Sequence, residues 1–395
     1  MRVGLAFLVI AYCLSQFFRA YLAVLAPLLR EELGLSTSDL SFASGIWFIS
    51  FAVMQLPVGW ALDTWGPRRT VSILFSFGAV GGVVVMAMAQ GPVGIALGMA
   101  LIGIGCAPVL MASYYIFARV FSAAVFGTLA GVTVGVSSFG NLLSAAPLAA
   151  TIEAFGWRET LWATSAFTAL IAIGIVLCVR NPQKPAGEAK GSFAELLRIR
   201  ALWPILAGMF ICYAPVAGIR GLWISPYIDD RFGASLDQIG VATLVMGLSM
   251  VLGNFLYGPI DRIFGSLKWP ILIGNAAVAL MCLALFLAPP GQITATIVIF
   301  AVIGVCGASY PAVMSHGRAF LPPHLTGRGV TLLNMFGMGG AGVMQFASGP
   351  AHARFAQLVG TEDAYGLLFA AIAAAILLGL IAYSAAQDGP RYREG

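Results

Sequence analysis

Long apolar stretches alternate with short polar segments along nearly the whole chain. Each stretch holds about 20 or more residues, which is enough for a helix to cross the hydrocarbon core of a bilayer. The pattern predicts twelve spanning helices, near residues 3–29, 40–62, 69–89, 94–118, 124–150, 159–180, 202–228, 237–259, 270–288, 293–316, 329–351 and 364–386. The first stretch runs on past Arg19 to Pro27 without a convincing cleavage site, so we expect a retained helix rather than a secretion signal.

One polar break, residues 181–200, lies at the middle of the chain and predicts a cytoplasmic linker between domains 1–180 and 201–395. The two halves resemble each other, because several landmarks recur at a fixed offset of 199 residues. These pairs are Pro27 and Pro226, Gly34 and Gly233, Ser36 and Ser235, Gly59 and Gly258, Gly66 and Gly265, Arg119 and Arg318, and Phe121 and Phe320. The recurrence predicts two six-helix bundles of related structure.

Composition indicates that the chain lies in a membrane, and the distribution of charge indicates its orientation there. Hydrophobic residues make up 60% of the chain and charged residues 9%, with a mean hydropathy of +0.93, as in membrane proteins. With both termini inside, 15 lysines and arginines fall in cytoplasmic segments and four in outer loops, which satisfies the positive-inside rule. We therefore expect a multi-pass protein of the bacterial cytoplasmic membrane with both termini cytoplasmic, and no nucleic-acid partner.

A charged motif joins the second and third predicted helices. It consists of Gly59, Asp63, Gly66, Arg68 and Arg69. Glycines permit a tight turn and a close helix approach, and Asp63 can pair with either arginine. The pattern resembles the helix 2–3 signature of the major facilitator superfamily of secondary transporters. This resemblance, with the internal repeat, implies an all-helical fold of two pseudo-symmetric six-helix bundles, alternating access, a solute site between the halves and conformational control by Asp63.

Arg19 is the candidate contact for a solute. All 16 carboxylates fall in predicted loops or at helix ends, so no carboxylate inside the membrane can neutralise it. An anionic or strongly polar solute is therefore expected. Tyr12, Ser15, Gln16 and Arg19 follow helical spacing and predict one polar stripe. By resemblance, the first helix lines the cavity, and organic-anion carriers often have an arginine eight residues before a proline; an arginine that snorkels outward is the alternative.

The seventh predicted helix carries a second polar and aromatic face with Tyr213, Arg220, Trp223 and Tyr227. By the 199-residue offset, Arg220 corresponds to Tyr21 rather than Arg19. Either the helical register slips or Arg220 is partly structural. Trp223 and Tyr227 can stack on a planar solute or lie in an interfacial belt. His316, near the inner end of the tenth helix, is expected to be solvated, with ion coupling as the alternative role.

Cysteine and methionine positions leave a metal alternative open. The six cysteines favour small apolar side chains over disulfides, but Cys13 and Cys212 are 199 residues apart, and Met246 and Met250 are one helical turn apart. Soft sulfur ligands select Cu(I). The start of the chain and the Arg220 region also resemble a subfamily of bacterial importers that includes copper and riboflavin carriers, although the His-x-x-x-Met motif of its copper members is absent.

The sequence therefore predicts a secondary active transporter of a small polar or anionic solute, with a riboflavin-like planar solute included, working in uptake. A Cu(I) importer and a drug or metabolite efflux carrier are the alternatives. Efflux is disfavoured because the fourth predicted helix lacks the arginine typical of proton-drug antiporters. No enzyme motif and no cofactor site are found. A monomer, with a coupling ion as a further partner, is expected.

Overall fold

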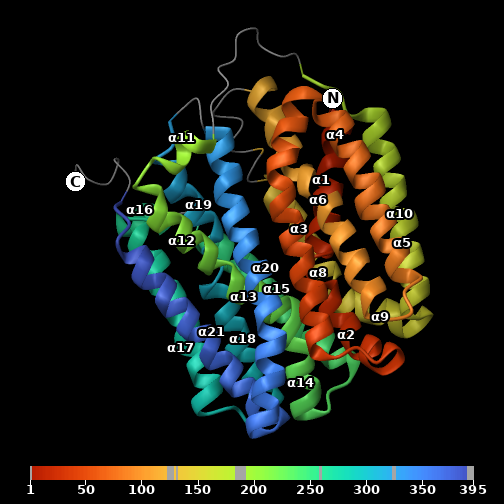
Figure 1. Cartoon of the computed structure of the whole chain (residues 1–395), viewed down its shortest axis with the longest axis vertical. Helices are drawn as coiled ribbons and strands as arrows, with labels where there is room; N and C mark the ends of the chain where they lie inside the picture. Colours follow the sequence, from red (N-terminus) through yellow and green to blue (C-terminus); the bar gives the residue numbers. More distant parts are fainter. Residues whose placement is uncertain are drawn as a thin grey trace. The chain divides into compact units, whose positions relative to one another are not determined.

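The computed structural model describes residues 2–121, 129, 132–182, 193–257, 260–322 and 326–388, and in these residues the secondary structure is helical (Figure 1). Ten helices in this part of the chain are long and apolar enough to cross a membrane. Two further pairs of helices, bent by 45° and 40°, meet the same test together, which gives up to 12 spans. The predicted all-helical membrane fold is confirmed.

The chain divides into two compact units, Met1–Glu188 and Ala189–Gly395. The division falls within the predicted linker 181–200, of which residues 183–192 lie outside the described part of the chain. Each unit has its own set of packed helices.

The first unit begins with the two arms of a bent helix, followed by a long hairpin and three more spans. Its elements are α1 (Arg2–Phe17), α2 (Tyr21–Leu33), α3 (Thr37–Thr64), α4 (Pro67–Leu74), the π-helical segment η1 (Phe75–Val80), α5 (Gly81–Ala87), α6 (Pro92–Val120), α8 (Phe139–Leu143), α9 (Ala146–Phe155) and α10 (Trp157–Cys178). The start of the predicted helix 124–150 lies outside the described residues.

The second unit repeats this order after a short surface helix. Its elements are α11 (Phe193–Leu197), α12 (Leu202–Cys212), α13 (Ala214–Gly218), the π-helical segment η2 (Ile219–Trp223), α14 (Ile224–Phe232), α15 (Leu236–Tyr257), α16 (Ile260–Phe264), α17 (Lys268–Leu287), α18 (Ile293–Cys306), α19 (Tyr310–Arg318), α20 (Thr326–Val359) and α21 (Thr361–Ser384).

Helix packing inside the two units follows the same scheme. In the first unit, α3 packs along α6, α1 packs against α6, α8 and α10, and α5 packs against α6 and α10. In the second unit, α15 packs along α18, α12 packs against α19, α20 and α21, and α17 packs against α18 and α21. Each unit therefore pairs its corresponding helices in the same way, as the 199-residue repeat predicts.

The repeat extends to the caps of the helices. Gly34 and Gly233 end α2 and α14 in the left-handed conformation, with φ of 67° and 59°. The next helices begin with matching side-chain caps: Ser36 exchanges hydrogen bonds with Asp39, and Ser235 does so with Gln238. These caps satisfy backbone N–H groups at the helix starts, so the repeated residues have repeated structural roles.

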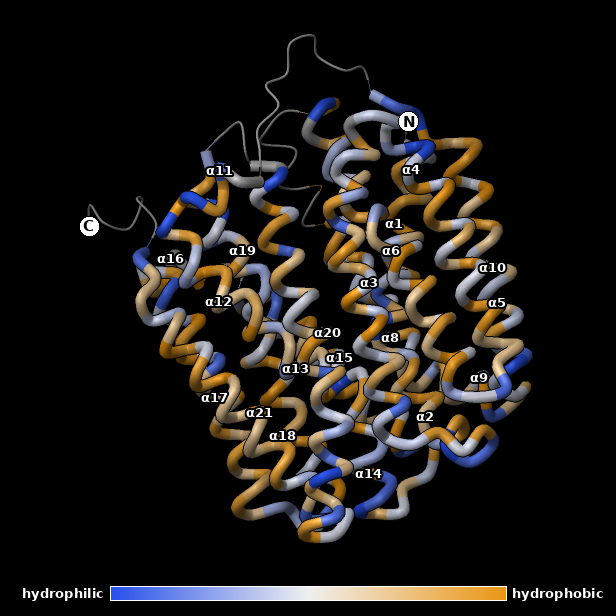
Figure 2. The backbone as a smooth tube through the Cα atoms, in the orientation of Figure 1, coloured by the Kyte–Doolittle hydropathy of each residue, from blue (hydrophilic) through white to orange (hydrophobic). Residues whose placement is uncertain are grey.

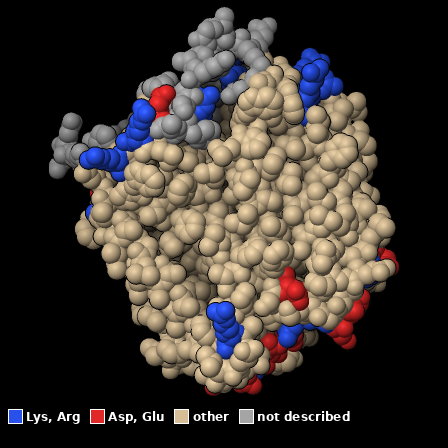
Figure 3. Space-filling model, viewed as in Figure 1, with Lys and Arg blue, Asp and Glu red and all other residues tan. Residues whose placement is uncertain are grey.

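The outward faces of the helices are apolar. Large side chains such as Phe77, Leu177, Phe255 and Ile381 are exposed, and hydrophobic residues dominate the middle of each helix in Figure 2. In each unit, the charged side chains visible in Figure 3 gather at the two ends of the helices. This distribution suits helices that face lipid along their length.

Two expectations about local structure were wrong. The first helix is not continuous, because α1 ends at Phe17 and the bend occupies residues 18–20. There the N–H groups of Arg19 and Ala20 bond three residues back, to Gln16 and Phe17, instead of four. Gly59 also makes no close helix contact, since a Cβ at this position would meet no atom within 4 Å.

Candidate solute-binding site

Arg19 lies in the bend between α1 and α2, and its guanidinium group lies over aromatic rings. Its Cζ atom is 5.9 Å from the ring centre of Tyr12, 5.5 Å from that of Trp47 and 5.4 Å from that of Phe51. Such cation–π contacts stabilise a guanidinium group away from bulk water. Arg19 is half-buried, so the cation is held inside the unit and is not fully enclosed.

Two of the three aromatic rings near Arg19 come from α3, the second span of the unit. Trp47 and Phe51 are stacked, with ring centres 5.2 Å apart and an interplanar angle of 20°. Both are buried. They are spaced i, i+4, so they share one helix face. This spacing is visible in the sequence, but it does not single these residues out, because nothing local shows that their face meets Arg19.

Polar atoms of Trp47 and of Gln16, which precedes Arg19 by three residues, have unused hydrogen-bonding capacity. The Trp47 Nε1–H group and the Gln16 Oε1 atom are buried and have no hydrogen-bond partner among the described residues. Gln16 is 8% exposed and Trp47 is 0% exposed. Cys106 of α6 lies close to Ser15 and Arg19. The site therefore offers a cation, an N–H donor and an amide oxygen acceptor. That Tyr12, Gln16 and Arg19 contact a solute stays a prediction.

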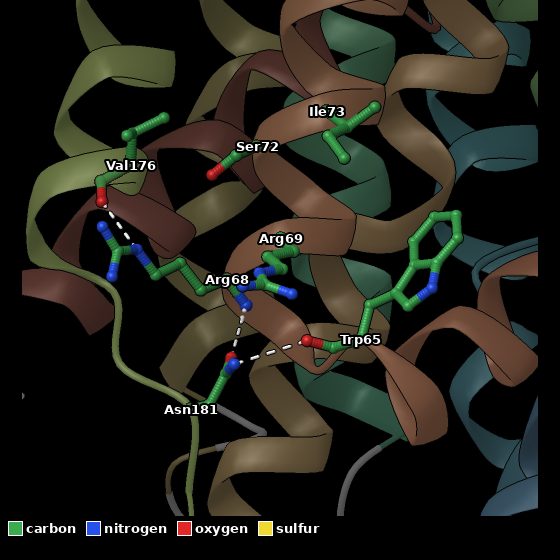
Figure 4. Close-up of a pocket in the computed structure, with 7 residues that line it drawn as sticks. All are labelled: Trp65, Arg68, Arg69, Ser72, Ile73, Val176 and Asn181. Atoms are coloured by element: carbon green, nitrogen blue, oxygen red, sulfur yellow. Dashed lines mark hydrogen bonds between the residues drawn. The ribbon is translucent and has the colours of Figure 1, made fainter.

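The charged motif forms a turn at the end of α3. Gly66 has φ of 82°, which favours glycine, so the predicted tight turn is confirmed. The Asn181 side chain accepts a 2.9 Å hydrogen bond from the Arg68 backbone N–H and donates one of 3.4 Å to the Trp65 carbonyl. Arg68 Nε donates a 2.8 Å bond to the Val176 carbonyl of α10 (Figure 4). The Asp63 side chain lies outside the described part, so its predicted pairing with Arg68 or Arg69 stays a prediction.

Arg220 of the second unit is buried in the π-helical segment η2. Its guanidinium group packs against α15, where a Cβ built on Gly247 would lie 3.1 Å from Nη2. A π-helical turn adds a residue to the helical turn and shifts the register of the residues after it. The sequence left open whether the register slips or Arg220 is partly structural, and the structure has features of both. The helical register changes at Arg220, and the Arg220 side chain packs within its own unit.

Trp223 and Tyr227 belong to an aromatic cluster inside the second unit. Trp223 Nε1 donates a 2.9 Å hydrogen bond to Ser348 Oγ, and its ring centre lies 5.1 Å from that of His352. Tyr227 packs edge-on to Tyr365 and Phe369, both at 5.3 Å. Trp223 and Tyr227 are buried, so neither lies in an exposed interfacial belt.

The sulfur atoms proposed for copper are divided between the two units of the chain. Cys13 lies in the first unit, whereas Cys212, Met246 and Met250 lie in the second. Cys212 and Met246 are buried, and α15 packs closely on Gly304 of α18 through the backbone of Met246 and Met250. The described residues contain no group of three or more His, Cys, Asp or Glu side chains that could hold a metal ion.

His316 is buried, so the expectation that it is solvated was wrong. Its Nε2 atom lies 2.8 Å from the Gln387 carbonyl oxygen and its Nδ1 atom lies 2.6 Å from the Tyr383 hydroxyl. A carbonyl only accepts, so Nε2 carries the hydrogen and Nδ1 accepts from Tyr383. The neutral imidazole thereby satisfies both contacts and joins α19, α21 and the segment after α21.

The fold and the site define a multi-pass membrane transporter: apolar helices arranged as two repeated six-helix units, with a cation held among aromatic rings within the first. A family model described as "Major Facilitator Superfamily" matches residues 8–343. The chain belongs to this superfamily of secondary transporters.

Two curated relatives are named as carriers of organic anions. One is a probable sulfoacetate transporter of Cupriavidus necator, 24% identical over 70% of this chain and 69% of the relative. The other is a galacturonate transporter of Dickeya chrysanthemi, 24% identical over 78% of this chain and 92% of the relative. These matches correct the resemblance to copper and riboflavin importers, which rested on two short segments.

Among solved structures, a D-xylose–proton symporter matches 100% of this chain and 99% of its own, with a TM-score of 0.76 and 15% identity. At this identity the likeness shows the fold alone.

Proposed function

We propose that this protein takes up a small organic anion by alternating access and that Arg19 binds the anionic group. The observation that carries the proposal is the position of the Arg19 guanidinium over Tyr12, Trp47 and Phe51. The rings hold the cation in place without neutralising its charge. An anion that enters the first unit can therefore pair with a guanidinium that is already fixed.

The polar atoms around Arg19 indicate the class of anion. A guanidinium group binds carboxylates, and other planar or tetrahedral oxyanions, through two parallel hydrogen bonds. Trp47 Nε1–H can donate to the same anion, and Gln16 Oε1 can accept from a hydroxyl group. A hydroxylated carboxylate or a sulfonate fits this donor and acceptor set. The named solutes of the two relatives, sulfoacetate and galacturonate, are organic anions, which supports the proposal.

In the second unit, we assign Arg220, Trp223 and Tyr227 a supporting role. Arg220 packs on Gly247, and Trp223 uses its N–H group to bind Ser348. These contacts fix the seventh span against α15 and α20. A planar solute stacked on Trp223 or Tyr227 would have to displace them, so we do not include a riboflavin-like solute in the proposal.

The orientation follows from the positive-inside rule, with 15 lysines and arginines on the side of the termini and four on the other. We accordingly place the protein in a bacterial cytoplasmic membrane with both termini in the cytoplasm. It acts as a transporter rather than an enzyme, as a monomer, with a coupling ion that sets the direction toward uptake.

Solute counterflow tests the proposal without knowledge of the coupling ion. Purified protein is reconstituted into vesicles loaded with unlabelled galacturonate or sulfoacetate, and entry of the labelled compound is followed, with riboflavin and Cu(I) as comparison solutes. We expect saturable exchange of an organic anion. Arg19→Gln should raise the apparent KM about tenfold or more, since a hydrogen bond to a charged group contributes about 1.5–3 kcal/mol.

Arg30→Gln is the matched control, because Arg30 lies in the last turn of α2 and the change removes the same charge from the same unit. It should leave KM near the wild-type value. An unchanged KM in Arg19→Gln at normal protein levels would overturn the assignment of Arg19, and exchange of riboflavin or Cu(I) alone would overturn the anion class.

A further inference from the structure

A surface pocket of about 490 Å³ lies at one end of the first unit, where α3 ends, α4 begins and α10 ends (Figure 4). Its lining consists of Trp65, Arg68, Arg69, Ser72, Ile73, Val176 and Asn181. The candidate spans Pro67–Ala87 and Trp157–Cys178 respectively begin and end here. The pocket is therefore at the level of a membrane surface, which the positive-inside rule assigns to the cytoplasmic side.

The lining is cationic. Arg68 and Arg69 contribute two guanidinium groups, both exposed, and the described residues that line the pocket include no carboxylate. The Ser72 hydroxyl is buried and has no hydrogen-bond partner in the described structure. A phosphate group is the ligand that suits two guanidinium groups and a hydroxyl donor.

Hydrogen bonds hold this arrangement in place. The Nε atom of Arg68 is bound to the Val176 carbonyl, which orients the guanidinium group and leaves its two terminal nitrogens for another ligand. The Asn181 side chain joins the Arg68 backbone to the Trp65 carbonyl across the turn. In Figure 4 the Arg68 side chain extends toward Val176, and the Arg69 side chain lies between Arg68 and Trp65. The Arg68 guanidinium and the Asn181 side chain are thus held in place by hydrogen bonds to the backbone around the pocket.

The surroundings of the pocket are apolar on the side of the membrane. Ile73 is 46% exposed, and Phe77 and Leu177 are exposed beyond it. Arg69, Ile73 and Phe77 follow one another at four-residue intervals, so a path of apolar surface leads away from the guanidinium groups. The exposed rings of Trp60 and Trp65, 5.3 Å apart, stand beside it, as aromatic side chains do at bilayer interfaces.

From this juxtaposition we propose that the pocket binds the phosphate headgroup of an anionic phospholipid of the cytoplasmic leaflet. Arg68, Arg69 and Ser72 contact the phosphate, and the acyl chains lie along Ile73, Phe77 and Leu177. The apolar path distinguishes a lipid from a free phosphate ion, which would gain nothing from it. A bound lipid of this kind joins the turn between α3 and α4 to the end of α10. The inference does not depend on the identity of the transported solute.

Native mass spectrometry of the full-length protein in detergent tests the proposal, with phosphatidylglycerol as the probe and phosphatidylcholine as the zwitterionic comparison. We expect retention of phosphatidylglycerol, and a fall of about tenfold or more in its binding to Arg68→Gln/Arg69→Gln, because each arginine near a membrane surface contributes about 1 kcal/mol toward anionic lipid. Arg198→Gln/Arg200→Gln removes two charges from another exposed segment and should leave binding nearly unchanged.

Two further arms keep the result interpretable. Arg69→Gln alone preserves the bond from Arg68 to Val176, so it tests the charge even if the double variant fails to fold; it should still weaken binding. Inorganic phosphate in excess should displace little lipid. Equal binding of phosphatidylcholine, an equal loss in the Arg198/Arg200 control, no loss in Arg69→Gln, or full displacement by inorganic phosphate would each overturn the proposal, the last by indicating a site for a soluble anion.

Discussion

The guanidinium carbon of Arg19 lies 5.5 Å from the centre of the Trp47 ring. The two residues come from different spans, and the contact places the cation over the face of the indole. The indole N–H group is in the plane of that ring and remains available to another ligand. One aromatic side chain can thus position the cation through its face and bind an anion through its edge.

Replacement of Trp47 by phenylalanine separates these two roles. Trp47→Phe keeps an aromatic face for Arg19 but removes the N–H donor. We expect correct folding and an increase in the apparent KM for the transported anion of about tenfold, the value of one hydrogen bond to a charged group. Counterflow kinetics measure this, with Trp60→Phe, at an exposed tryptophan, as control. A KM equal to the wild-type value would show that the indole N–H does not contact the solute.

The two motif glycines should respond differently to alanine. Gly66 has φ of 82°, and a Cβ there would lie 2.7 Å from the Asn181 side chain, whereas a Cβ on Gly59 meets nothing within 4 Å. We expect Gly66→Ala to lower the free energy of unfolding by about 1–3 kcal/mol, the cost of a side chain at φ 82° and ψ 166°, a conformation that is essentially confined to glycine. Gly59→Ala, inside α3, should raise it by about 0.4–1 kcal/mol, because alanine has less backbone entropy to lose on folding. Thermal unfolding in detergent compares them, and equal losses would contradict the turn described for Gly66.

The effects of substituting His316 and Tyr383 on the free energy of unfolding should be coupled, because the two side chains share one hydrogen bond. Tyr383→Phe removes the hydroxyl that donates to Nδ1 and leaves a buried acceptor unpaired, at a cost of about 1–3 kcal/mol. His316→Phe should cost at least as much, because the Gln387 carbonyl also loses its donor. In the double variant the losses should be less than additive. Additive losses in denaturant unfolding would show that the two side chains act independently.

Hydropathy and the 199-residue repeat were sufficient to predict most of the fold. The spans follow from long local stretches of apolar residues, and the caps at Ser36 and Ser235 depend on residues only three positions away. The bend at residues 18–20 was not predictable in this way. It contains neither glycine nor proline, and the aromatic contacts of Phe17, Phe18 and Tyr21, 5.5–5.6 Å apart, surround it.

The candidate site was predicted only in part for a similar reason. Arg19 is conspicuous because an arginine inside a span is costly, and its neighbour Gln16 follows from helical spacing. That Trp47 and Phe51 meet it depends on the packing of α3 against the first span. Burial of His316 and Trp223 likewise comes from α20 and α21, which are distant in sequence, and positions near a helix end had suggested exposure.

The bend at residues 18–20 divides the first span into two rigid arms with Arg19 at the elbow. The outer arm, α2, has 13 residues and is therefore about 20 Å long. A rotation of about 10° at the elbow would carry its far end through roughly 3 Å, while Arg19 itself, close to the pivot, would hardly shift. The far end of α2 can therefore move while Arg19, the proposed solute contact, keeps nearly the same position.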